Sequence, residues 1–430
     1  MSSRDPEFSP GSTRLVVAEV ISLEEFRSLE SEWRAIASYS GTPFATWDWA
    51  FAWWGQLREQ KLGVRDTLSI RTVRTRTGEL VAVAPMLVSQ RPSFGPIRLR
   101  QLQFFGADPN VTEQRGLVAR PEWKREALLA LINHARSNAG GWDCMQLSGI
   151  PIDLELGDLA SSPDFEWQGE TADYLLTVPD SWQVFRAGLP RNIKESLRKC
   201  YNSLGRDGLE FSLNVVQDVA AVAPALDRFF ALHAARARVS GTVNHSNAFA
   251  GAETKAFLRD VCSRFAARGA LRIFQLLVAG KVVAVRIGFL VGDALYLYYS
   301  GYDPAFAKYS VMTTTVAEAI QYAIAHGIPQ VNLSTGNDVS KTRWNPTERK
   351  TRQAFVLSPS RRARLTHRLY RQAVLTIQSL PALRQATRFL ARRSTPPPAP
   401  AAEVHSTVDA APSRLEPRLE VSEAHTSAVN

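Results

Sequence analysis

One stretch, 271–344, constrains the fold more than any other part of the chain. It begins with two apolar runs, 272–278 and 281–287, which are separated by Ala279-Gly280. This pattern predicts a tight β-hairpin, because glycine supplies the backbone conformation that such turns require. A third run, 294–299, is rich in tyrosine and predicts another strand. The stretch is therefore expected to open with three successive strands.

The second part of this stretch predicts a helix and a returning strand. The helix is expected to begin near Ser310, whose hydroxyl can cap the first-turn amides, and to stop at Gly327. Apolar side chains recur at helical spacing from Met312 to Ala323. A strand at 331–333 follows. A strand that leads into a helix N-terminus and then into a parallel strand can bind an anion.

The net charge of +10 suggests a nucleic-acid-binding protein until the charges are located. Residues 360–393 contain nine arginines and no acidic residue, whereas 394–430 carry a net charge of −3. The other 359 residues therefore carry only +4 of the total. Because the net charge of residues 1–359 is small, no DNA partner is expected for this part of the chain.

The arginine-rich segment is predicted to be a helical extension, 360–393, interrupted at Pro381. Two interpretations of 361–393 stand side by side. It is either a solvated basic helix on the core, or an attachment to an anionic membrane surface or an acidic partner. The tail, 394–430, is rich in Pro, Ala, Ser and Glu and is predicted to be disordered.

Cysteine usage and apolar patterning indicate a cytoplasmic protein. Cys144, Cys200 and Cys262 show no pairing or metal-ligand spacing, which predicts buried thiols in a reducing compartment. Lys281 and Arg286 interrupt the longest apolar stretch, so no membrane span is expected. The N-terminus lacks the apolar core of a secretory signal. Contact with the inner membrane would then be peripheral, through the arginine-rich segment.

The first half of the chain repeats landmarks of the second half. Three pairs recur in the same order: 68–84 resembles the hairpin 272–287, Phe104–Pro109 resembles Tyr299–Pro304, and Met145–Gly149 resembles Asn332–Gly336. Such agreement indicates an internal duplication of one α/β unit. We expect a first, diverged unit at 14–172 and a second unit at 173–359.

An aromatic segment, 44–54, contains four tryptophans and two phenylalanines. Two interpretations were weighed: a buried helix that seals a seam between domains, or a wall for an apolar substrate. The buried helix is favoured, because aromatic side chains dominate protein cores in general.

Several standard sites are absent from the sequence. There is no glycine-rich dinucleotide fingerprint, phosphate-binding GK[ST] loop, G-x-S-x-G or H-E-x-x-H motif. His233 and His245 are the only nearby pair of histidines, which is too few to predict a metal site. The helix N-terminus near Lys308, Ser310 and Thr313 remains as a candidate phosphate site, with an ordinary capped helix as the alternative.

Longer runs carry a resemblance to a known family. They are Tyr302-Asp-Pro-Ala-Phe-Ala-Lys-Tyr-Ser-Val-Met312, Ala325-His-Gly-Ile-Pro-Gln-Val-Asn-Leu-Ser-Thr-Gly-Asn-Asp338 and Ser340-Lys-Thr-Arg-Trp344. Together they resemble the GNAT-fold acyltransferases of the CelD type, which are associated with bacterial polysaccharide synthesis and related to Fem-type aminoacyltransferases. The similarity covers about 174–357. It implies tandem GNAT-like α/β units with mixed sheets flanked by helices, a basic helical C-terminal extension and a disordered tail.

The resemblance implies a reaction and a set of site residues. An acyl group would pass from acetyl-CoA, another acyl-CoA or an acyl carrier to an amine or hydroxyl of a small, sugar-linked or lipid-linked acceptor in envelope metabolism. No metal is implied. The thioester arm would lie along 294–300, where a backbone N–H would polarise its carbonyl. The implied residues are Tyr298, Asp338 and Lys341 for catalysis; Lys308, Tyr309, Ser310, Val311 and Thr313 for the cofactor; and Arg191, Lys194, Arg236, His245, Asn332, Arg343 and Trp344 for substrates.

Departures from the family pattern keep other functions open. The family usually has glycines in the pyrophosphate loop, where this chain has Val311 and Thr313. Relatives often have Asp at the position of Asn332, and an asparagine cannot act as a base. Together with the basic helix 191–206, this favours a Fem-like aminoacyltransferase that uses charged tRNA as the alternative. A third hypothesis is a non-catalytic scaffold, recruited to a polysaccharide-synthesis complex through 361–393.

Overall fold

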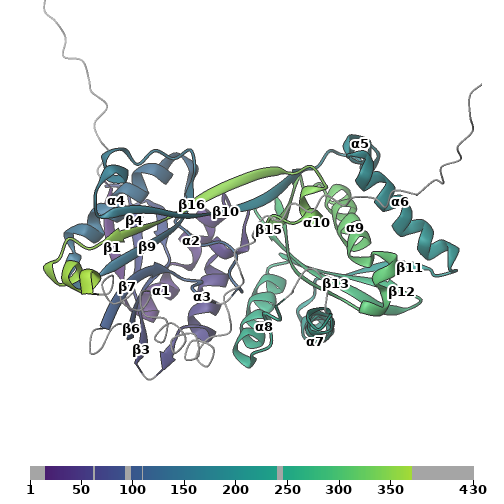
Figure 1. Ribbon diagram of the computed structural model, residues 1–430, viewed down its shortest axis with the longest axis horizontal. Helices are drawn as coiled ribbons and strands as arrows, with labels where there is room; N and C mark the ends of the chain where they lie inside the picture. Colours follow the sequence, from purple (N-terminus) through teal and green to yellow (C-terminus); the bar gives the residue numbers. More distant parts are fainter. Residues whose placement is uncertain (1–14, 62, 93–97, 109, 240–245, 370–430) are drawn as a thin grey trace, which may run out of the picture.

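The fold consists of two α/β halves that lie side by side and share one sheet (Figure 1). The computed structural model describes residues 15–61, 63–92, 98–108, 110–239 and 246–369. Within these residues twelve strands form the shared sheet, and four more form a small sheet in the first half. Helices cover both faces, as the mixed α/β prediction required.

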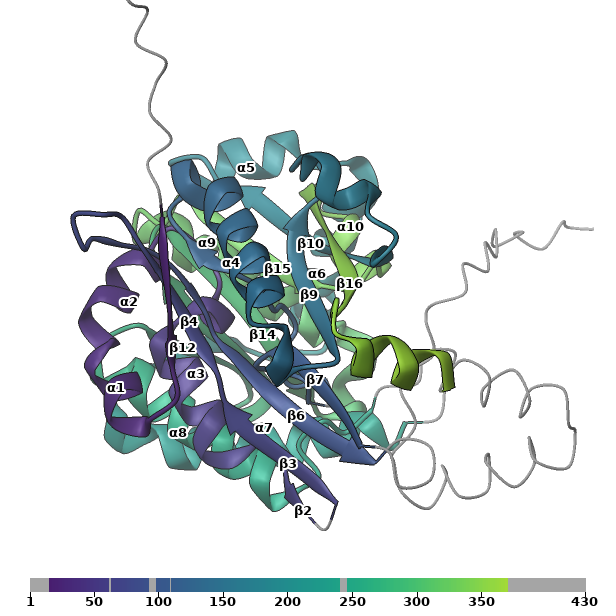
Figure 2. The ribbon, with the colours of Figure 1, turned by 90° about the vertical axis from the view of Figure 1, so that its left-hand side faces the viewer.

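The first half contains a long bent hairpin with helices on both faces. Its main elements are β1 (Val16–Val20), α1 (Leu23–Ser28), α2 (Glu30–Ala37), α3 (Trp47–Gln56), β2 (Gln60–Lys61), β3 (Val64–Leu68), β4 (Ile70–Arg74), β5 (Leu80–Ala84), β6 (Met86–Pro92), β7 (Arg98–Phe104), β8 (Val118–Ala119), α4 (Lys124–Ser137) and β9 (Cys144–Pro151). Leu128, Leu131 and Ile132 of α4 pack on one face of the sheet, while α1–α3 cover the other (Figure 2).

The first arm of the predicted hairpin at 68–84 is divided in the structure. β3 pairs with β6 in the large sheet, whereas β4 pairs with β5 in the small one. The break falls at Ser69 on one arm of the hairpin and at Pro85 on the other. Proline cannot donate to the ladder, so the hairpin bends there and its tip turns into the small sheet.

Over 271–344 the second half follows the predicted order of three strands, a helix and a returning strand. Its main elements are β10 (Phe165–Thr177), α5 (Trp182–Gly188), α6 (Arg191–Arg206), β11 (Phe211–Val216), α7 (Val219–Ala237), α8 (Ala252–Ala267), β12 (Leu271–Val278), β13 (Lys281–Val291), β14 (Ala294–Tyr302), α9 (Val311–Ala325), β15 (Gln330–Thr335), α10 (Val339–Thr342) and β16 (Thr347–Leu357). Ala279 and Gly280 have φ of 48° and 76°, as a tight hairpin turn requires.

The two halves repeat one motif, in agreement with the predicted tandem α/β units. In the second half β14 leads through α9 to β15, and β14 and β15 pair in parallel. In the first half β7 leads through α4 to β9, and this pair is also parallel. Each half therefore has a strand, a helix and a parallel strand at the same place in its order of elements.

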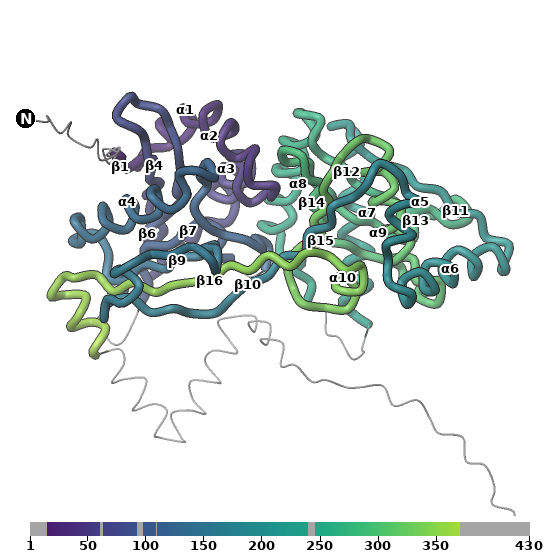
Figure 3. The backbone as a smooth tube through the Cα atoms, turned by 90° about the horizontal axis from the view of Figure 1, so that it is seen from above, coloured from purple at the N-terminus to yellow at the C-terminus, as the bar shows by residue number. Residues whose placement is uncertain are grey.

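Two strands, β10 and β16, join the halves. β10 pairs with β15 of the second half and with β16, and β16 pairs in turn with β9 of the first half. Figure 3 shows both strands running from one half into the other. The expected domain boundary between residues 172 and 173 lies inside β10, so a shared strand stands where a linker would be expected.

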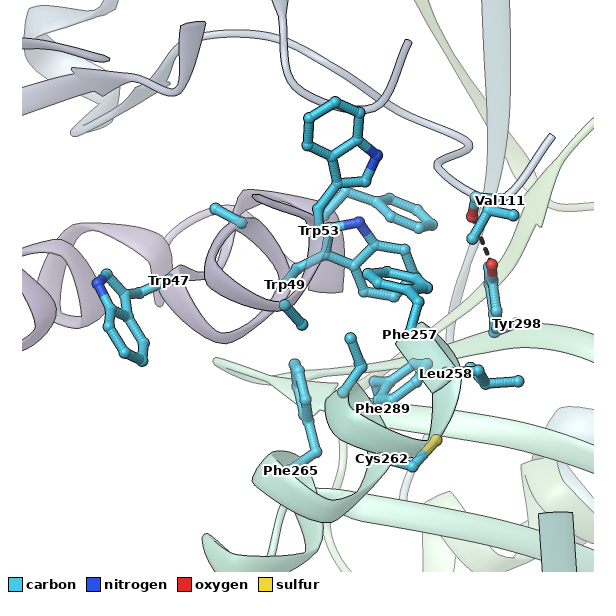
Figure 4. Packing of buried hydrophobic residues seen from close by; sticks show 14 of the residues in the cluster. Trp47, Trp49, Trp53, Val111, Phe257, Leu258, Cys262, Phe265, Phe289 and Tyr298 are labelled. Atoms are coloured by element: carbon cyan, nitrogen blue, oxygen red, sulfur yellow. Dashed lines mark hydrogen bonds between the residues drawn. The ribbon is translucent and has the colours of Figure 1, made fainter. Parts of the chain in front are cut away.

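The aromatic segment of α3 seals the seam between the halves (Figure 4). The ring of Trp49 packs against Phe257 at 5.0 Å and Tyr298 at 5.5 Å between centroids. Trp47, Trp49 and Trp53 are all at most 4% exposed. The buried-helix interpretation is therefore confirmed, and α3 and α8 form the centre of a hydrophobic core common to both halves.

A buried ion triad adds a charged link across the same seam. The Asp48 carboxylate is 1% exposed and lies 2.7 Å from Nη2 of Arg34 and 2.5 Å from Nη1 of Arg268. Arg34 belongs to the first half and Arg268 follows α8 of the second. The two guanidinium groups compensate a carboxylate that would otherwise be costly to bury.

Only the start of the arginine-rich extension falls within the described residues. Residues 361–369 are helical and pack on the first half, where Arg362 Nη1 lies 3.3 Å from the carboxylate of Asp143. The predictions for 370–393 and for the tail lie outside the described residues. All three cysteines are buried. Among the residues that the structure describes, no helix is long and apolar enough to span a membrane.

Candidate active site

The candidate site begins where β14 and β15 separate. Their parallel pairing starts at Ala294↔Gln330 and ends at Tyr296↔Asn332. Beyond that pair β14 continues to Tyr302 without β15 beside it. The separation leaves strand edges that can receive an extended ligand, since unpaired backbone groups need a partner.

A carboxylate from the first half occupies this separation. The hydroxyl of Tyr296 on β14 donates to Oε2 of Glu113 at 2.6 Å. Burial raises the pKa of Glu113, and hydrogen bonds from Tyr296 and Ser334 and the charges of Lys341 and Arg286 oppose this only in part. A carboxyl group with a raised pKa can accept or release a proton closer to neutral pH.

A loop from the first half carries Glu113 into place. The Asp108 carboxylate accepts from the amides of Val111 at 2.7 Å and Thr112 at 2.9 Å, and from Nε1 of Trp53 at 2.8 Å. Such bonds fix a turn in the way that aspartate commonly does. The loop therefore meets the second half with a defined backbone shape.

Two further tyrosines of β14 hold the same loop. The Tyr298 hydroxyl donates to the carbonyl of Val111, and the Tyr299 hydroxyl donates to the carbonyl of Asn110. Together with Tyr296, three side chains of one strand bind consecutive parts of a segment from the other half. The position of Glu113 therefore depends on both halves.

A cavity of about 750 Å³ lies in the seam beside Glu113. Aromatic residues of α3 and its approach form part of the lining, with charged residues from both halves around them. The lining includes Thr42, Phe44, Trp49, Phe105, Glu113, Arg115, Gly116, Lys124, Asp153, Asp173, Glu348, Arg349 and Lys350. The aromatic segment thus both seals the seam and lines a cavity, so the two interpretations weighed from sequence are compatible.

The end of β15 is anchored by a buried network. Asn332 is fully buried, and its Nδ2 donates to Oδ2 of Asp173 at 2.5 Å while its Oδ1 accepts from the amide of Ser334 at 2.8 Å. Nη2 of Arg349 lies 2.5 Å from the same Asp173 oxygen. Both amide atoms of Asn332 have partners within the fold, which favours a role in positioning β15. Its predicted contact with a substrate remains a prediction.

Comparisons with known proteins agree with this geometry. Residues 191–342 match the family described as acetyltransferase (GNAT) domain. The matched region lies in the second half and is referred to below as the GNAT domain. No curated protein matches the chain. The CelD type predicted from sequence remains a prediction.

Solved structures show similar folds at low sequence identity. FemX is 11% identical, with a TM-score of 0.50 over 75% of this chain and 95% of FemX. A tandem GNAT protein from the clavulanic acid biosynthesis pathway is 10% identical, with a TM-score of 0.42 over 81% of this chain and 100% of that one. The C-terminal domain (DUF2156) of a putative lysylphosphatidylglycerol synthetase from Agrobacterium fabrum is 12% identical, with a TM-score of 0.46 over 81% and 97%. These likenesses concern the fold.

The N-terminus of α9 in the GNAT domain differs from the expected cap. The helix begins at Val311 after Ser310, as predicted, but Ser310 has a φ of 53° and its side chain makes no capping hydrogen bond. The prediction of a serine cap is wrong, because the left-handed backbone supplies the turn and directs the Ser310 carbonyl to the amides of Thr313 and Thr314.

The other residues predicted to bind the cofactor already have partners in the fold. Lys308 and Tyr309 both contact the Asp207 carboxylate, at 3.4 Å and 2.8 Å. Tyr309 and Val311 belong to a hydrophobic cluster. The Thr313 hydroxyl accepts from Nη2 of Arg343 at 2.5 Å. Lys308 and Ser310 are the exposed members of this group, so they are the ones that a ligand at the helix N-terminus can reach.

Asp338 and Lys341 form one unit at the end of β15. Asp338 caps α10, and its carboxylate lies 2.8 Å from Nζ of Lys341. Lys341 also donates to the carbonyls of Thr335 and Gly336, so its three donors are all used. Burial raises the pKa of Asp338, but the Lys341 charge and the hydrogen bonds outweigh it and lower the pKa overall. Their predicted catalytic roles remain predictions, and the contacts favour a loop-holding role.

The predicted substrate-binding residues separate into a group at the site and others away from it. Arg236 and Arg343 lie near enough to Asp338 to interact electrostatically with it. Arg191 is 91% exposed and pairs with Glu195 on α6. Lys194 donates to the carbonyl of Ala187, and Trp344 is 1% exposed in a hydrophobic cluster. His245 lies outside the described residues.

The buried position of Tyr298 leaves little room for its predicted catalytic role. It is 1% exposed, its hydroxyl proton is directed at Val111, and burial raises its pKa far above the ordinary value. These contacts are those of a seam residue. Catalysis by Tyr298 remains a prediction, and its removal is a direct test of the two roles.

Sequence reasoning missed Glu113 and Arg286. Glu113 lies in an irregular segment of the half that was treated as a diverged copy, so no periodicity or motif marked it. Arg286 lies on β13, where it seemed only to interrupt an apolar strand. Burial lowers the pKa of Arg286 to about 10, and the Glu113 charge opposes this change. A buried arginine in a predicted strand was the available signal.

In the first half, residues 115–116 lie against β9 where β7 and β9 separate. β7 and β9 pair as far as Gln103↔Gln146. Beyond that point a Cβ on Gly149 would lie 2.4 Å from the Arg115 carbonyl oxygen, and one on Gly116 would lie 2.9 Å from that of Ser148. The backbone of 115–116 thus packs directly on β9. The cavity beside Glu113 is lined in part by these same residues, Arg115, Gly116, Ser148 and Gly149. The hypothesis that only the second half carries an active site remains a prediction.

Proposed function

We propose that the protein is an acyltransferase whose donor lies in the second half and whose general base comes from the first. The observation that carries the proposal is the hydrogen bond from Tyr296 to Glu113 at the separation of β14 and β15. Glu113 also lines the seam cavity. Its carboxylate therefore borders both the edge of β14, proposed to hold an acyl thioester, and the cavity proposed to hold the acceptor.

The reaction requires one bond to form and one to break at the donor carbonyl. An amine or hydroxyl of the acceptor attacks the carbonyl carbon, and Glu113 takes the proton that the nucleophile loses. The carbon–sulfur bond then breaks, and the thiolate that leaves takes a proton from water. A backbone N–H on the unpaired edge of β14 can stabilise the charge on the carbonyl oxygen.

The acceptor is proposed to enter from the seam cavity. A volume of about 750 Å³ is within the range of cavities that hold small molecules. Its mixed lining suits a polar molecule with an apolar face better than a bare alkyl chain. An amine- or hydroxyl-bearing sugar, free or lipid-linked, meets this description, as does a precursor from envelope polysaccharide or lipid metabolism.

Donor binding and base catalysis can be tested separately on the full chain. Calorimetry with CoA, acetyl-CoA and a longer acyl-CoA should show binding that weakens in K308A and S310A. Thiol release from the bound donor, with a panel of amino sugars as acceptors, should fall at least about a hundredfold in E113Q. If no acyl-CoA binds, the donor assignment fails. If E113Q keeps full turnover, the base assignment fails.

A second candidate function uses an aminoacyl ester of tRNA as the donor. The observation in its favour is the exposed basic face of α6, which presents Arg191, Arg198, Lys199 and Arg206 to solvent. FemX has a similar fold, and its name is that of the Fem type considered in this alternative. Binding of aminoacyl-tRNA that weakens steeply with salt, and that is lost in R198Q/K199Q, would favour it over acyl-CoA. If the affinity for aminoacyl-tRNA changes neither with salt nor with these substitutions, the exposed face of α6 is not the tRNA-binding surface.

A further inference from the structure

The seam cavity contains two cations that the fold itself does not pair. Arg115 and Lys124 both line the cavity. Neither side chain makes a hydrogen bond or an ion pair with any residue that the structure describes. Other cations of the lining are paired, since Arg349 binds Asp173 and Lys350 binds Glu348. The two unpaired cations therefore leave positive charge available inside the cavity.

Both cations are partly withdrawn from water. Burial lowers the pKa of Arg115, and the Asp108 charge opposes this change. Burial and the nearby Arg349 lower the pKa of Lys124, while Asp153 opposes them. A desolvated cation without a partner is costly. An anionic ligand would remove that cost by supplying charge-assisted hydrogen bonds.

Arg115 places one of these positive charges near Glu113, the proposed general base. Arg115 follows Glu113 by two residues in a segment without regular structure. Two residues span at most about 7 Å. Both side chains line the same cavity, so an acceptor whose nucleophile reaches Glu113 can also present a second group to Arg115.

We propose that the acceptor carries an anionic group, a phosphate or a carboxylate, that Arg115 and Lys124 bind in the seam cavity. The substrate class is a small amine or alcohol with an acidic substituent, such as a sugar phosphate or an acidic sugar. This inference rests on the proposed function for the role of the cavity. The anion site itself stands on the cavity and its two unpaired cations.

The first experiment measures anion binding to the full chain by calorimetry. Pyrophosphate represents phosphate chemistry and malonate represents carboxylate chemistry, each titrated with and without saturating CoA to occupy any donor phosphate site. One of the two anions should bind in the presence of CoA. Its dissociation constant should rise at least about tenfold in R115Q and in K124Q, because each variant removes a charge-assisted contact.

Two control variants test whether the loss of anion binding is specific to Arg115 and to the shape of its side chain. R76Q removes an exposed arginine from the turn between β4 and β5 and should leave the dissociation constant unchanged. R115K keeps the charge but loses the fork of donors, so it should weaken binding less than R115Q. Two independent cations are changed, so misfolding of one variant still leaves the other as a test.

Each outcome decides the inference. Binding of pyrophosphate alone assigns a phosphate, and binding of malonate alone assigns a carboxylate. If neither anion binds at millimolar concentration, or if R115Q and K124Q bind as the wild type does, the inference is overturned. Acyl-CoA affinity, measured on the same variants, should not change. Failure of acyl-CoA binding in the wild type would refute the proposed donor while leaving the anion site intact.

Discussion

The hydroxyl of Tyr296 donates to Oε2 of Glu113 at 2.6 Å, although the two residues lie 183 positions apart and in different halves of the chain. This bond links the central strand of the GNAT domain to a loop of the first half. The duplicated unit is therefore more than a structural support, because it inserts a carboxylate at the edge of the strand on which the donor is proposed to lie.

Replacing Glu113 by glutamine should abolish most turnover without weakening donor binding. The substitution removes the proposed base while keeping the shape of the side chain. We expect kcat to fall by a factor of about 100 to 10,000, the usual contribution of a general base. Single-turnover thiol release measures this fall, and calorimetry with acyl-CoA should show an unchanged dissociation constant.

Phenylalanine at position 296 is the matched control for that test. Y296F keeps the carboxylate but removes the hydroxyl that orients it, so turnover should fall by less than in E113Q. The pH profile should also move, because the hydrogen bond from Tyr296 is one of the contributions that lower the pKa of Glu113. In Y296F that pKa should be higher, and the rising limb of kcat/KM should shift to higher pH. Equal losses in both variants, with no shift, would contradict a base held by Tyr296.

Glu113 should also make stability fall as pH rises. Its folded pKa is raised above the ordinary value of 4.5, mainly by burial. Between these two values the folded state holds a proton that the unfolded chain has lost, so the free energy of unfolding decreases with pH. Urea unfolding from pH 4.5 to 8 should give a more negative slope in the wild type than in E113Q, because the other titrating groups, including His233 with its lowered pKa, contribute equally to both. E195Q changes an exposed helix residue, so its slope should match that of the wild type.

The fold could be predicted from sequence to a large extent because its signals are local. The hairpin at Ala279-Gly280, the start of α9 at Val311 and the end of that helix at Gly327 follow from turn residues and from apolar periodicity. The duplication was visible because turn and strand landmarks recur in order. By contrast, the sharing of β10 and β16 between the halves depends on strand pairing over long separations, which no local pattern encodes.

The site was predicted less well, for a physical reason. Its residues come from both halves, and the carboxylate at its centre is on a loop without periodicity. Asn332 was expected to contact a substrate, but its partner Asp173 lies 159 positions away. Buried polar networks of this kind depend on tertiary contacts, and only the structure shows which polar residues are already satisfied.

Tyr298 offers a test between a structural and a catalytic role. Y298F leaves the Val111 carbonyl without its partner inside the seam, which should cost about 1–3 kcal/mol in the free energy of unfolding. Turnover of the folded protein should change by less than about threefold. Y39F alters a tyrosine that is 62% exposed and should leave stability unchanged. A loss of turnover above a hundredfold, without loss of stability, would restore the catalytic interpretation.

Asp48 should be sensitive to substitution although it lies outside the site. D48N removes the carboxylate between Arg34 and Arg268 and leaves two cations facing each other across the seam. Breaking a buried ion pair in this way typically costs about 3–5 kcal/mol. Arg34 and Arg268 are 24% and 39% exposed, so water partly solvates them and the lower end of that range is expected.

The control for Asp48 is an ion pair at the surface. Asp227 and Arg259 are 63% and 44% exposed and lie 2.6 Å apart, so D227N should change stability by no more than about 1 kcal/mol. Urea unfolding, followed by tryptophan fluorescence, reports on the seam because Trp49 and Trp53 lie there. Equal effects of D48N and D227N would mean that the charged link contributes no more to stability than an ion pair at the surface. A larger effect of D48N would show that the charged link contributes to their union.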